Sequence, residues 1–328
     1  MLQYLIIQLD DTSTSYCHYE NEKTEHHLIS LENLKAGILF AMKENLIIHF
    51  VYPDYELPQE YKSAINTIDH SDIVSSLCED VDLRNAADII VFQCWADIEQ
   101  FDFTENMVCV LRTSKADLLE KHLFLSSVLS TISRLNVVIT DVDTFTEQDF
   151  VRYKNVLRSL SEEVGKLYVE GKSPQLNLLT DRMMLDKMNN CNAGWEHVTL
   201  APDGKFYVCP AFYLAGGDED YGLGKSKFNI GDLQTGVNIK NPQLYKLDYA
   251  PLCRNCDAYQ CKRCVWLNRK TTYEMNTPSH EQCVVAHLER NASRELLNNL
   301  RKHGEFLPEK EEIKEITYLD PFEVRKEW

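Results

Sequence analysis

The sequence predicts an α/β protein: a parallel-sheet, partial-barrel-like domain of βα repeats, then a small cysteine-rich domain and a C-terminal helix. Over roughly the first 180 residues, short apolar runs rich in Val and Ile alternate with stretches of helical apolar spacing. Seven of the eleven cysteines then fall between positions 191 and 283. A last helical pattern follows these cysteines and completes the prediction.

Six apolar runs are predicted to form the parallel sheet. Most are nearly continuous in aliphatic residues, which is typical of strands buried on both faces. In chain order they are Tyr4–Leu9, Leu46–Tyr52, Asp88–Gln93, Met107–Arg112, Leu135–Asp141 and Gln175–Leu179.

Three stretches between these strands are predicted to be helices, because their apolar residues recur every three or four positions. They are Leu31–Asn45, Leu118–Arg134 and Gln148–Gly171. The last is the longest; it begins after a threonine and ends at a glycine, with Pro174 beyond, as helix boundaries commonly do.

The composition changes near residue 190. A Pro-Asp-Gly turn at 202–204 is expected to join His197–Leu200 to Phe206–Val208 in a hairpin. The segment Gly216–Gly236 holds six of the twelve glycines and is expected to be a long loop, and Val284–His303 is expected to be a helix. We therefore expect three parts: an α/β domain over 1–185, a cysteine-rich domain over 186–290, and a helix with a charged tail over 291–328.

The formal net charge of −17 disfavours partners that need a positive surface. Nucleic acid and anionic membrane surfaces are therefore not expected as partners, whereas a basic peptide stays compatible with the charge. The N-terminus lacks a basic region, and no apolar run approaches the ~18–20 residues of a membrane span. We expect a cytoplasmic protein, in which reduced thiols and an odd cysteine count favour metal binding over disulfides.

The cysteines of residues 191–283 have the spacing of metal ligands. The core of the group reads Cys253-x2-Cys256-x4-Cys261-x2-Cys264, in which polar loop residues separate the thiols. In ferredoxins that hold two clusters, three cysteines of a short run bind one cluster and the fourth crosses to the other. The same division here gives two sites, listed next by their ligands. Site 1 is Cys191, Cys209 and Cys264 with a fourth ligand that the sequence does not identify, and site 2 is Cys253, Cys256, Cys261 and Cys283.

Two metals suit these thiols. The short spacing of the four cysteines from Cys253 to Cys264 resembles ferredoxin ligation and favours two Fe–S clusters of the 4Fe–4S type. The alternative is structural zinc, in which an imidazole from His197, His280 or His287 completes eight ligands.

The cysteine pattern resembles the SPASM domain, the auxiliary-cluster domain of radical SAM enzymes that modify peptides and proteins. The resemblance includes Gly204 with Cys209 five residues on, and the phrase Asn229-Ile230-Gly231-Asp232-Leu233. Two gaps of the run, x4 and x2, are one residue shorter than the family commonly has. The division of ligands that the family implies matches the one above.

The N-terminal part departs from radical SAM enzymes. Its cysteines, Cys17, Cys78, Cys94 and Cys109, are at least fifteen residues apart, so no CxxxCxxC loop is present. We expect the last three to be core thiols. Cys17-His18 has the chemistry of a nucleophile–base pair, but neighbours on a strand point to opposite faces. The whole chain is similar to the CXXX-repeat peptide maturase family, which implies a radical SAM-like domain without S-adenosylmethionine.

That resemblance implies an accessory maturation protein for ribosomally made, cysteine-rich (CXXX-repeat) peptides. Its partners would be the precursor peptide and a radical SAM maturase, so the chain would be a non-autonomous component of an enzyme system. The alternative is a non-catalytic, zinc-stabilised scaffold that binds a peptide or an enzyme. The cations Arg254, Lys262 and Arg263 beside the cysteines are expected to form a solvated loop face.

Overall fold

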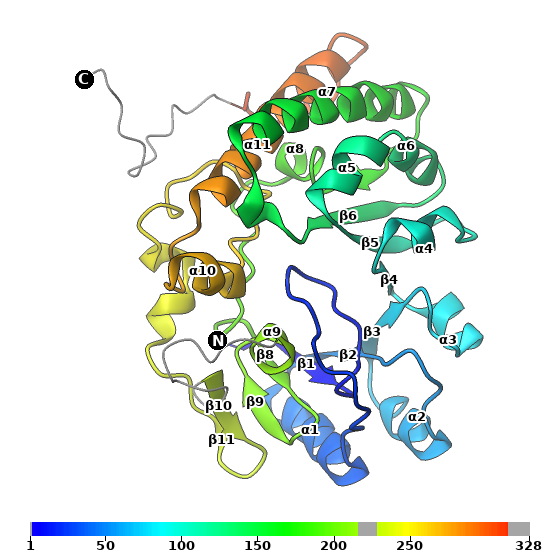
Figure 1. Ribbon diagram of the computed structural model, residues 1–328, viewed down its shortest axis with the longest axis vertical. Coiled ribbons are helices and arrows are strands. Elements are labelled where there is room, and N and C mark those ends of the chain that lie inside the picture. Colours follow the sequence, from blue (N-terminus) through cyan, green and yellow to red (C-terminus); the bar gives the residue numbers. More distant parts are fainter. Residues whose placement is uncertain (1, 216–227, 314–328) are drawn as a thin grey trace.

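The protein is built on one eleven-stranded sheet that curves into an open, horseshoe-like partial barrel (Figure 1). The computed structural model describes residues 2–215 and 228–313. The strand order is β11-β10-β9-β8-β1-β2-β3-β4-β5-β6-β7. The strands are β1 Tyr4–Gln8, β2 Ile47–Val51, β3 His70–Ser75, β4 Ile89–Phe92, β5 Val108–Thr113, β6 Arg134–Ile139, β7 Gln175–Leu176, β8 His197–Leu200, β9 Lys205–Tyr207, β10 Asn229–Asp232 and β11 Gly236–Val237.

The sheet is parallel from β1 to β7 and continues into the cysteine-rich part of the chain. Strand β8 pairs in parallel with β1, in a register that places His197 opposite Tyr4. Strands β9, β10 and β11 then add in antiparallel fashion. The predicted hairpin is therefore confirmed, and it extends the sheet of the N-terminal part. The expected boundary at 185/186 remains a proposal.

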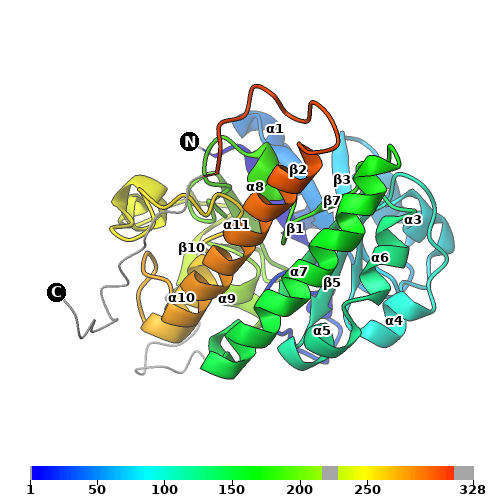
Figure 2. The same ribbon diagram turned by 90° about the horizontal axis from the view of Figure 1, so that it is seen from above.

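The helices cover the outer face of the curved sheet, and α7 and α11 lie side by side across one end of it (Figures 1 and 2). Their bounds are α1 Leu31–Glu44, α2 Gln59–Ile65, α3 Val81–Ala86, α4 Trp95–Glu99, α5 Lys115–Lys121, α6 Phe124–Leu129, α7 Glu147–Val169, α8 Asp181–Met184, α9 Ala211–Leu214, α10 Val265–Thr272 and α11 His280–Leu300, with short 3₁₀ turns η1 Val142–Thr144, η4 Pro242–Tyr245 and η5 Leu247–Tyr249.

Local capping explains where the long helices begin. The Thr146 hydroxyl accepts from the N–H of Asp149, and the Asp149 carboxylate accepts from the N–H of Thr146, which makes a reciprocal capping box at α7. At α11, the Ser279 hydroxyl accepts from the N–H of Gln282. Such contacts satisfy main-chain donors that the first helical turn leaves free.

Four sequence expectations differ from the structure. Strand β3 was not expected, because its first half, His-Ser-Asp, is polar and gives no apolar signal. The single helix expected over Leu118–Arg134 is instead α5 and α6, and Arg134 already belongs to β6. Helix α11 begins at His280, four residues earlier than expected, so that Cys283 lies in its first turn. The segment Gly216–Gly236 is not a loop throughout: β10 lies within it, and β11 begins at its last residue, Gly236. Residues 216–227 of this segment and 314–328 of the tail lie outside the described residues.

Side chains alternate between two apolar layers along the strands. Leu5 and Ile7 of β1 belong to the main core between the sheet and the helices. Ile6 belongs to a smaller cluster with Val51, Ile73, Val91 and Val110, as the period of two requires. Tyr16, from the loop between β1 and α1, packs against this smaller cluster and covers the inner face of the sheet. No helix among the described residues is long and apolar enough to cross a membrane.

Candidate metal centre

The proposed ligands of site 1 come from three segments that fold onto one another. Cys191 precedes β8, Cys209 follows β9, and Cys264 is the residue that caps the N-terminus of α10. The N–H of Cys191 donates to the carbonyl of Lys262 at 2.7 Å, which ties the first segment to the third. Gly204, in the turn between β8 and β9, has a φ of +77°, so the turn needs a residue without a side chain there.

The three thiols of site 1 affect one another's ionisation. Burial raises the pKa of Cys209 well above its ordinary value, and the nearby charges of Cys264 and Cys191 raise it further. Burial likewise raises the pKa of Cys264, with Cys191 as the next cause. Cys191 and Cys264 are 73 positions apart in the sequence. The structure nevertheless brings the three cysteines into one electrostatic environment.

The proposed ligands of site 2 begin in a tight turn. The N–H of Cys256 donates to the carbonyl of Cys253 at 3.0 Å. Burial raises the pKa of Cys261 to about 12, and the charges of Cys253 and Cys256 add to this effect. The CxxC pair and Cys261 thus lie within electrostatic range of one another.

Helix α11 supplies the other wall of site 2. Cys256 Sγ lies 3.5 Å from His287 Nε2. Cys283 is four residues before His287 and therefore on the same face of the helix. Two further contacts hold the turn against α11: Arg290 Nη1 donates to Asp257 Oδ1 at 2.6 Å, and Gln260 Nε2 donates to the carbonyl of Ala286 at 2.6 Å.

Main-chain N–H groups approach the sulfurs in a repeated arrangement. The N–H of Ala258 lies 3.5 Å from Cys256 Sγ. At five of the seven cysteines, the N–H two residues further along opposes the rise in pKa that burial causes. The five cysteines are Cys191, Cys209, Cys256, Cys261 and Cys264. Donors aimed at sulfur stabilise the thiolate form, which is the form that binds metal.

Arg263 corrects the expectation of a solvated cationic face. Arg254 and Lys262 are exposed, but Arg263 has an exposed fraction of 0%. Its Nε donates to Asn190 Oδ1 and its Nη2 donates to the carbonyl of Tyr245, both at 2.7 Å. Burial lowers its pKa, and the charges of thiols from both sites, Cys253, Cys191, Cys261 and Cys264, oppose that effect. Arg263 therefore lies between the two sites.

The residues present fit a thiolate-bound metal in their chemistry. Within the described ranges, no three His, Cys, Asp or Glu side chains are close enough together to hold a metal ion as they stand. Arg263 Nη1 is nevertheless buried with no hydrogen-bond partner in the described structure. A buried cation without a countercharge is costly, and metal-bound thiolates with a net negative charge would supply one. Binding requires the thiols to lose protons and close on the metal.

The four N-terminal cysteines have different environments. Cys78 and Cys109 are buried, as expected. Cys94 is exposed, so the expectation of a core thiol was wrong there. Cys17 lies beside site 1: burial raises its pKa to about 12, and the charge of Cys191 is the next cause. Sequence spacing gives no signal for this, because Cys17 is 174 positions from Cys191.

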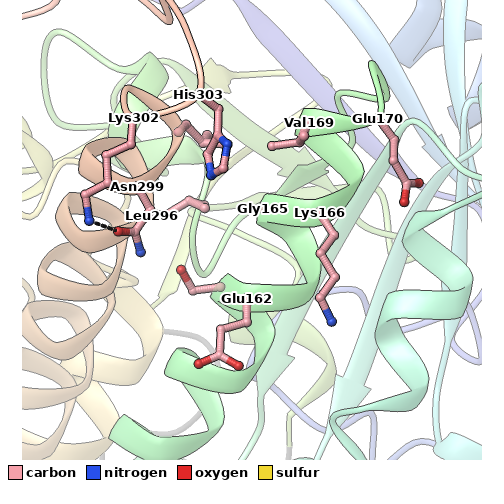
Figure 3. Close-up of a pocket in the computed structure, with 11 residues that line it drawn as sticks. Glu162, Gly165, Lys166, Val169, Glu170, Leu296, Asn299, Lys302 and His303 are labelled. Atoms are coloured by element: carbon pink, nitrogen blue, oxygen red, sulfur yellow. Dashed lines mark hydrogen bonds between the residues drawn. The ribbon is translucent and has the colours of Figure 1, made fainter.

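Two cavities have different relations to the cysteines. A cavity of about 590 Å³ lies between the C-terminal halves of α7 and α11, where Gly165, Leu296 and His303 are among the lining residues (Figure 3). It is roughly 20 Å along α11 from Cys283 at 1.5 Å per residue. A cavity of about 80 Å³ is lined in part by Cys261, Gln282 and Glu289. The smaller one therefore belongs to the surroundings of site 2.

Comparison with known proteins gives a fold but no family. No protein-family model and no curated protein match the sequence. Among solved structures, the chain is similar to anSMEcpe, a SPASM-domain radical SAM maturase. A form with bound AdoMet and Cp18Cys peptide has 11% identity and a TM-score of 0.56, over 92% of this chain and 100% of the other.

Two further anSMEcpe structures agree. A histidine-tagged form with bound AdoMet has 11% identity and a TM-score of 0.59, over 92% of this chain and 96% of that one. A form with AdoMet and Kp18Cys peptide has 11% identity and a TM-score of 0.55, over 91% and 99%. The chain therefore has a radical SAM/SPASM-related α/β fold with a large, mostly parallel sheet.

Proposed function

We propose that this chain is an accessory protein of peptide maturation that binds two auxiliary Fe–S clusters and acts with a partner radical SAM enzyme. One observation carries the proposal: two groups of thiols with auxiliary-cluster spacing lie on a radical SAM/SPASM-related fold. The proposed ligands are Cys191, Cys209 and Cys264 at site 1, and Cys253, Cys256, Cys261 and Cys283 at site 2. The clusters would be of the 4Fe–4S type.

The proposed substrate is a ribosomally made precursor peptide with CXXX repeats. Support for a peptide partner comes from two of the anSMEcpe structures, which hold a bound peptide. The CXXX-repeat assignment rests on the sequence resemblance described above. The partner maturase, the division into three parts and the cytoplasmic location also remain predictions from the sequence.

Two features support a non-autonomous role. Residues 1–185 contain no CxxxCxxC loop, which in radical SAM enzymes holds the cluster that binds S-adenosylmethionine. In addition, Tyr16 packs on the inner face of the sheet, against the cluster that includes Ile6 and Val110. Both features favour chemistry that starts on the partner enzyme. Clusters in this chain would supply electron transfer or help to position the peptide.

The test is a metal count on anaerobically purified protein. About eight irons with matching labile sulfide per chain are expected for two 4Fe–4S clusters. The Cys94→Ala variant is the control, because this exposed thiol is outside both sites. Protein without iron and sulfide contradicts the Fe–S proposal. Maturation of a CXXX-repeat precursor by the partner alone, at an undiminished rate, contradicts the accessory role.

The second candidate function is a zinc-stabilised, non-catalytic scaffold for a peptide or an enzyme. One observation favours it: an imidazole lies beside a cysteine of each site. His197 Nε2 is 3.9 Å from Cys191 Sγ, and His287 Nε2 is 3.5 Å from Cys256 Sγ. Imidazole and thiolate together are common zinc ligands. Two zinc ions and no sulfide in the same measurement would support the scaffold.

A further inference from the structure

The loop between β1 and α1 is fixed inside the curved sheet. Figure 1 shows this loop, in dark blue, rising from β1 into the space enclosed by the strands. Gln93, just after β4, donates to Thr14 Oγ1 at 2.7 Å and to the carbonyl of Ser15 at 2.8 Å. These contacts hold the start of the loop against the sheet, immediately before Cys17.

Arg112 of β5 fixes the segment around Cys17 itself. Its side chain is 2% exposed. Nε donates to the carbonyl of Cys17 at 2.9 Å, and Nη2 donates to the carbonyl of Tyr19 at 2.6 Å. The remaining nitrogen, Nη1, donates to Gln93 Oε1. One buried guanidinium therefore sets the main-chain position of Cys17 by contacts on both sides of His18.

The same segment contacts the part of the chain that carries Cys264. The rings of Tyr19 and Trp266 meet edge to face, with centroids 6.5 Å apart. Tyr19 is two residues after Cys17, and Trp266 is two residues after Cys264. His18, next to Cys17, lines the same small cavity as Lys262, and the carbonyl of Lys262 accepts from the N–H of Cys191 at 2.7 Å. The loop that carries Cys17 therefore lies against the segment that carries Cys264, and that segment is tied to Cys191.

We propose that Cys17 is the fourth thiolate of site 1, together with Cys191, Cys209 and Cys264. This assignment rests on the proposed function, because it presupposes that site 1 binds a metal. It adds a ligand from the N-terminal loop to a group drawn otherwise from residues 191–264, and Arg112 is its positioning residue.

His197 is the other donor near site 1. Its Nε2 lies closer to the carbonyl of Cys191, at 2.9 Å, than to the sulfur of the same residue, at 3.9 Å. His197 is itself the first residue of β8. The contact with the main-chain carbonyl occupies Nε2, which favours His197 as a neighbour of the site over a role as its ligand.

Four thiolates give site 1 a closed coordination shell. A closed site suits electron transfer or structural stabilisation, whereas a site of three thiolates leaves a position for substrate. The metal at site 1 would also join the N-terminal loop to the segment before α10. Removal of Cys17 is therefore expected to open a coordination position as well as to weaken the site.

The test compares Cys17→Ala with His197→Gln and Cys94→Ala in anaerobically purified, full-length protein. We expect Cys17→Ala to lower metal content, by up to half, and to change the spectrum of any metal that stays at site 1. For an iron cluster the readout is the electron paramagnetic resonance of the reduced protein. His197→Gln and Cys94→Ala are expected to match the unmodified protein in both measurements.

The outcomes separate this assignment from the proposed function. Metal content and spectra of Cys17→Ala equal to those of the unmodified protein overturn the assignment alone. A loss in His197→Gln with none in Cys17→Ala assigns the ligand to histidine. Absence of metal from the unmodified protein overturns both proposals. If Cys17→Ala does not fold, the unmodified protein is treated with a chelator, mildly oxidised and analysed for disulfide bonds. A disulfide between Cys17 and a cysteine of site 1 is expected. Its absence overturns the assignment.

Discussion

Cys256 Sγ lies 3.5 Å from His287 Nε2, which joins the CxxC turn to helix α11. The two residues come from segments separated by 31 positions, and their contact places Cys283, one helical turn before His287, on the side of α11 that faces the turn. The proposed site 2 would therefore be complete only when α11 is docked. Its metal content and the packing of the helix should change together.

The first prediction concerns this shared dependence. Cys256→Ala is expected to remove the metal of site 2 and to destabilise the domain, because a structural site contributes its binding free energy to folding. Metal analysis and urea unfolding measure the two effects, with Cys94→Ala as the control. Full metal content in Cys256→Ala would show that the division of ligands is wrong.

The second prediction uses Arg263. Arg263→Met is expected to destabilise the metal-loaded protein by about 3 kcal/mol, since it removes the countercharge of two anionic sites. After chelation the loss of stability should be smaller. The buried guanidinium of Arg263 then has no negative charge beside it, so keeping it is itself costly. Urea unfolding with and without chelator measures the difference. The exposed neighbour Arg254, changed to Met, is the matched control. Equal losses in both states would contradict a role for Arg263 beside the metals.

The third prediction concerns the buried ion pair between Arg290 and Asp257. Arg290→Met is expected to cost roughly 3–5 kcal/mol of the free energy of unfolding, because Asp257 stays buried without its partner. Arg152→Met on α7 removes an exposed arginine and serves as the control. Thermal or urea unfolding gives the comparison. A loss no larger than that of the control would mean that water replaces the pair.

The fourth prediction is a pH dependence set by Glu289, which is 8% exposed. Burial raises its pKa from 4.5 to about 7, while Tyr153 donates to its Oε1 at 2.8 Å. Between these values the folded protein holds a proton that the unfolded chain has lost. The stability contributed by this residue therefore falls as the pH rises from about 4.5 to about 7. Above pH 7 the folded protein bears the full free-energy cost of a buried, ionised carboxylate.

Glu289→Gln removes the titration and keeps the size of the side chain. At pH 8 the variant is expected to be more stable than the unmodified protein, by a difference on the order of 3 kcal/mol. The difference should shrink as the pH falls towards 5. Urea unfolding across this range is the measurement, and Glu295→Gln, at an exposed position of α11, is the control. A difference that does not vary with pH would contradict the assignment to Glu289.

Local patterns in the sequence predicted much of the fold. Continuous apolar runs predicted β1, β2, β4, β5, β6 and β7 because strands buried on both faces need apolar residues at every position. The pattern failed at β3, where His70, Ser71 and Asp72 occupy the end of the strand that is less buried. It also missed the start of α11, although Ser279 with Gln282 three residues later is a capping signal.

The cysteine spacing by itself determined which residues are candidates for metal binding, and it is the basis of the proposed division of seven thiols into two groups. That information is local, because ligands of one turn must be close in the chain. Only the tertiary structure placed the loop of Cys17 against the segment of Cys264, buried Arg263 against Asn190 and Tyr245, and brought His287 to Cys256. The physical reason is that these pairs are set by sheet curvature and helix docking. Both depend on contacts between segments far apart in the chain, and no short pattern encodes them.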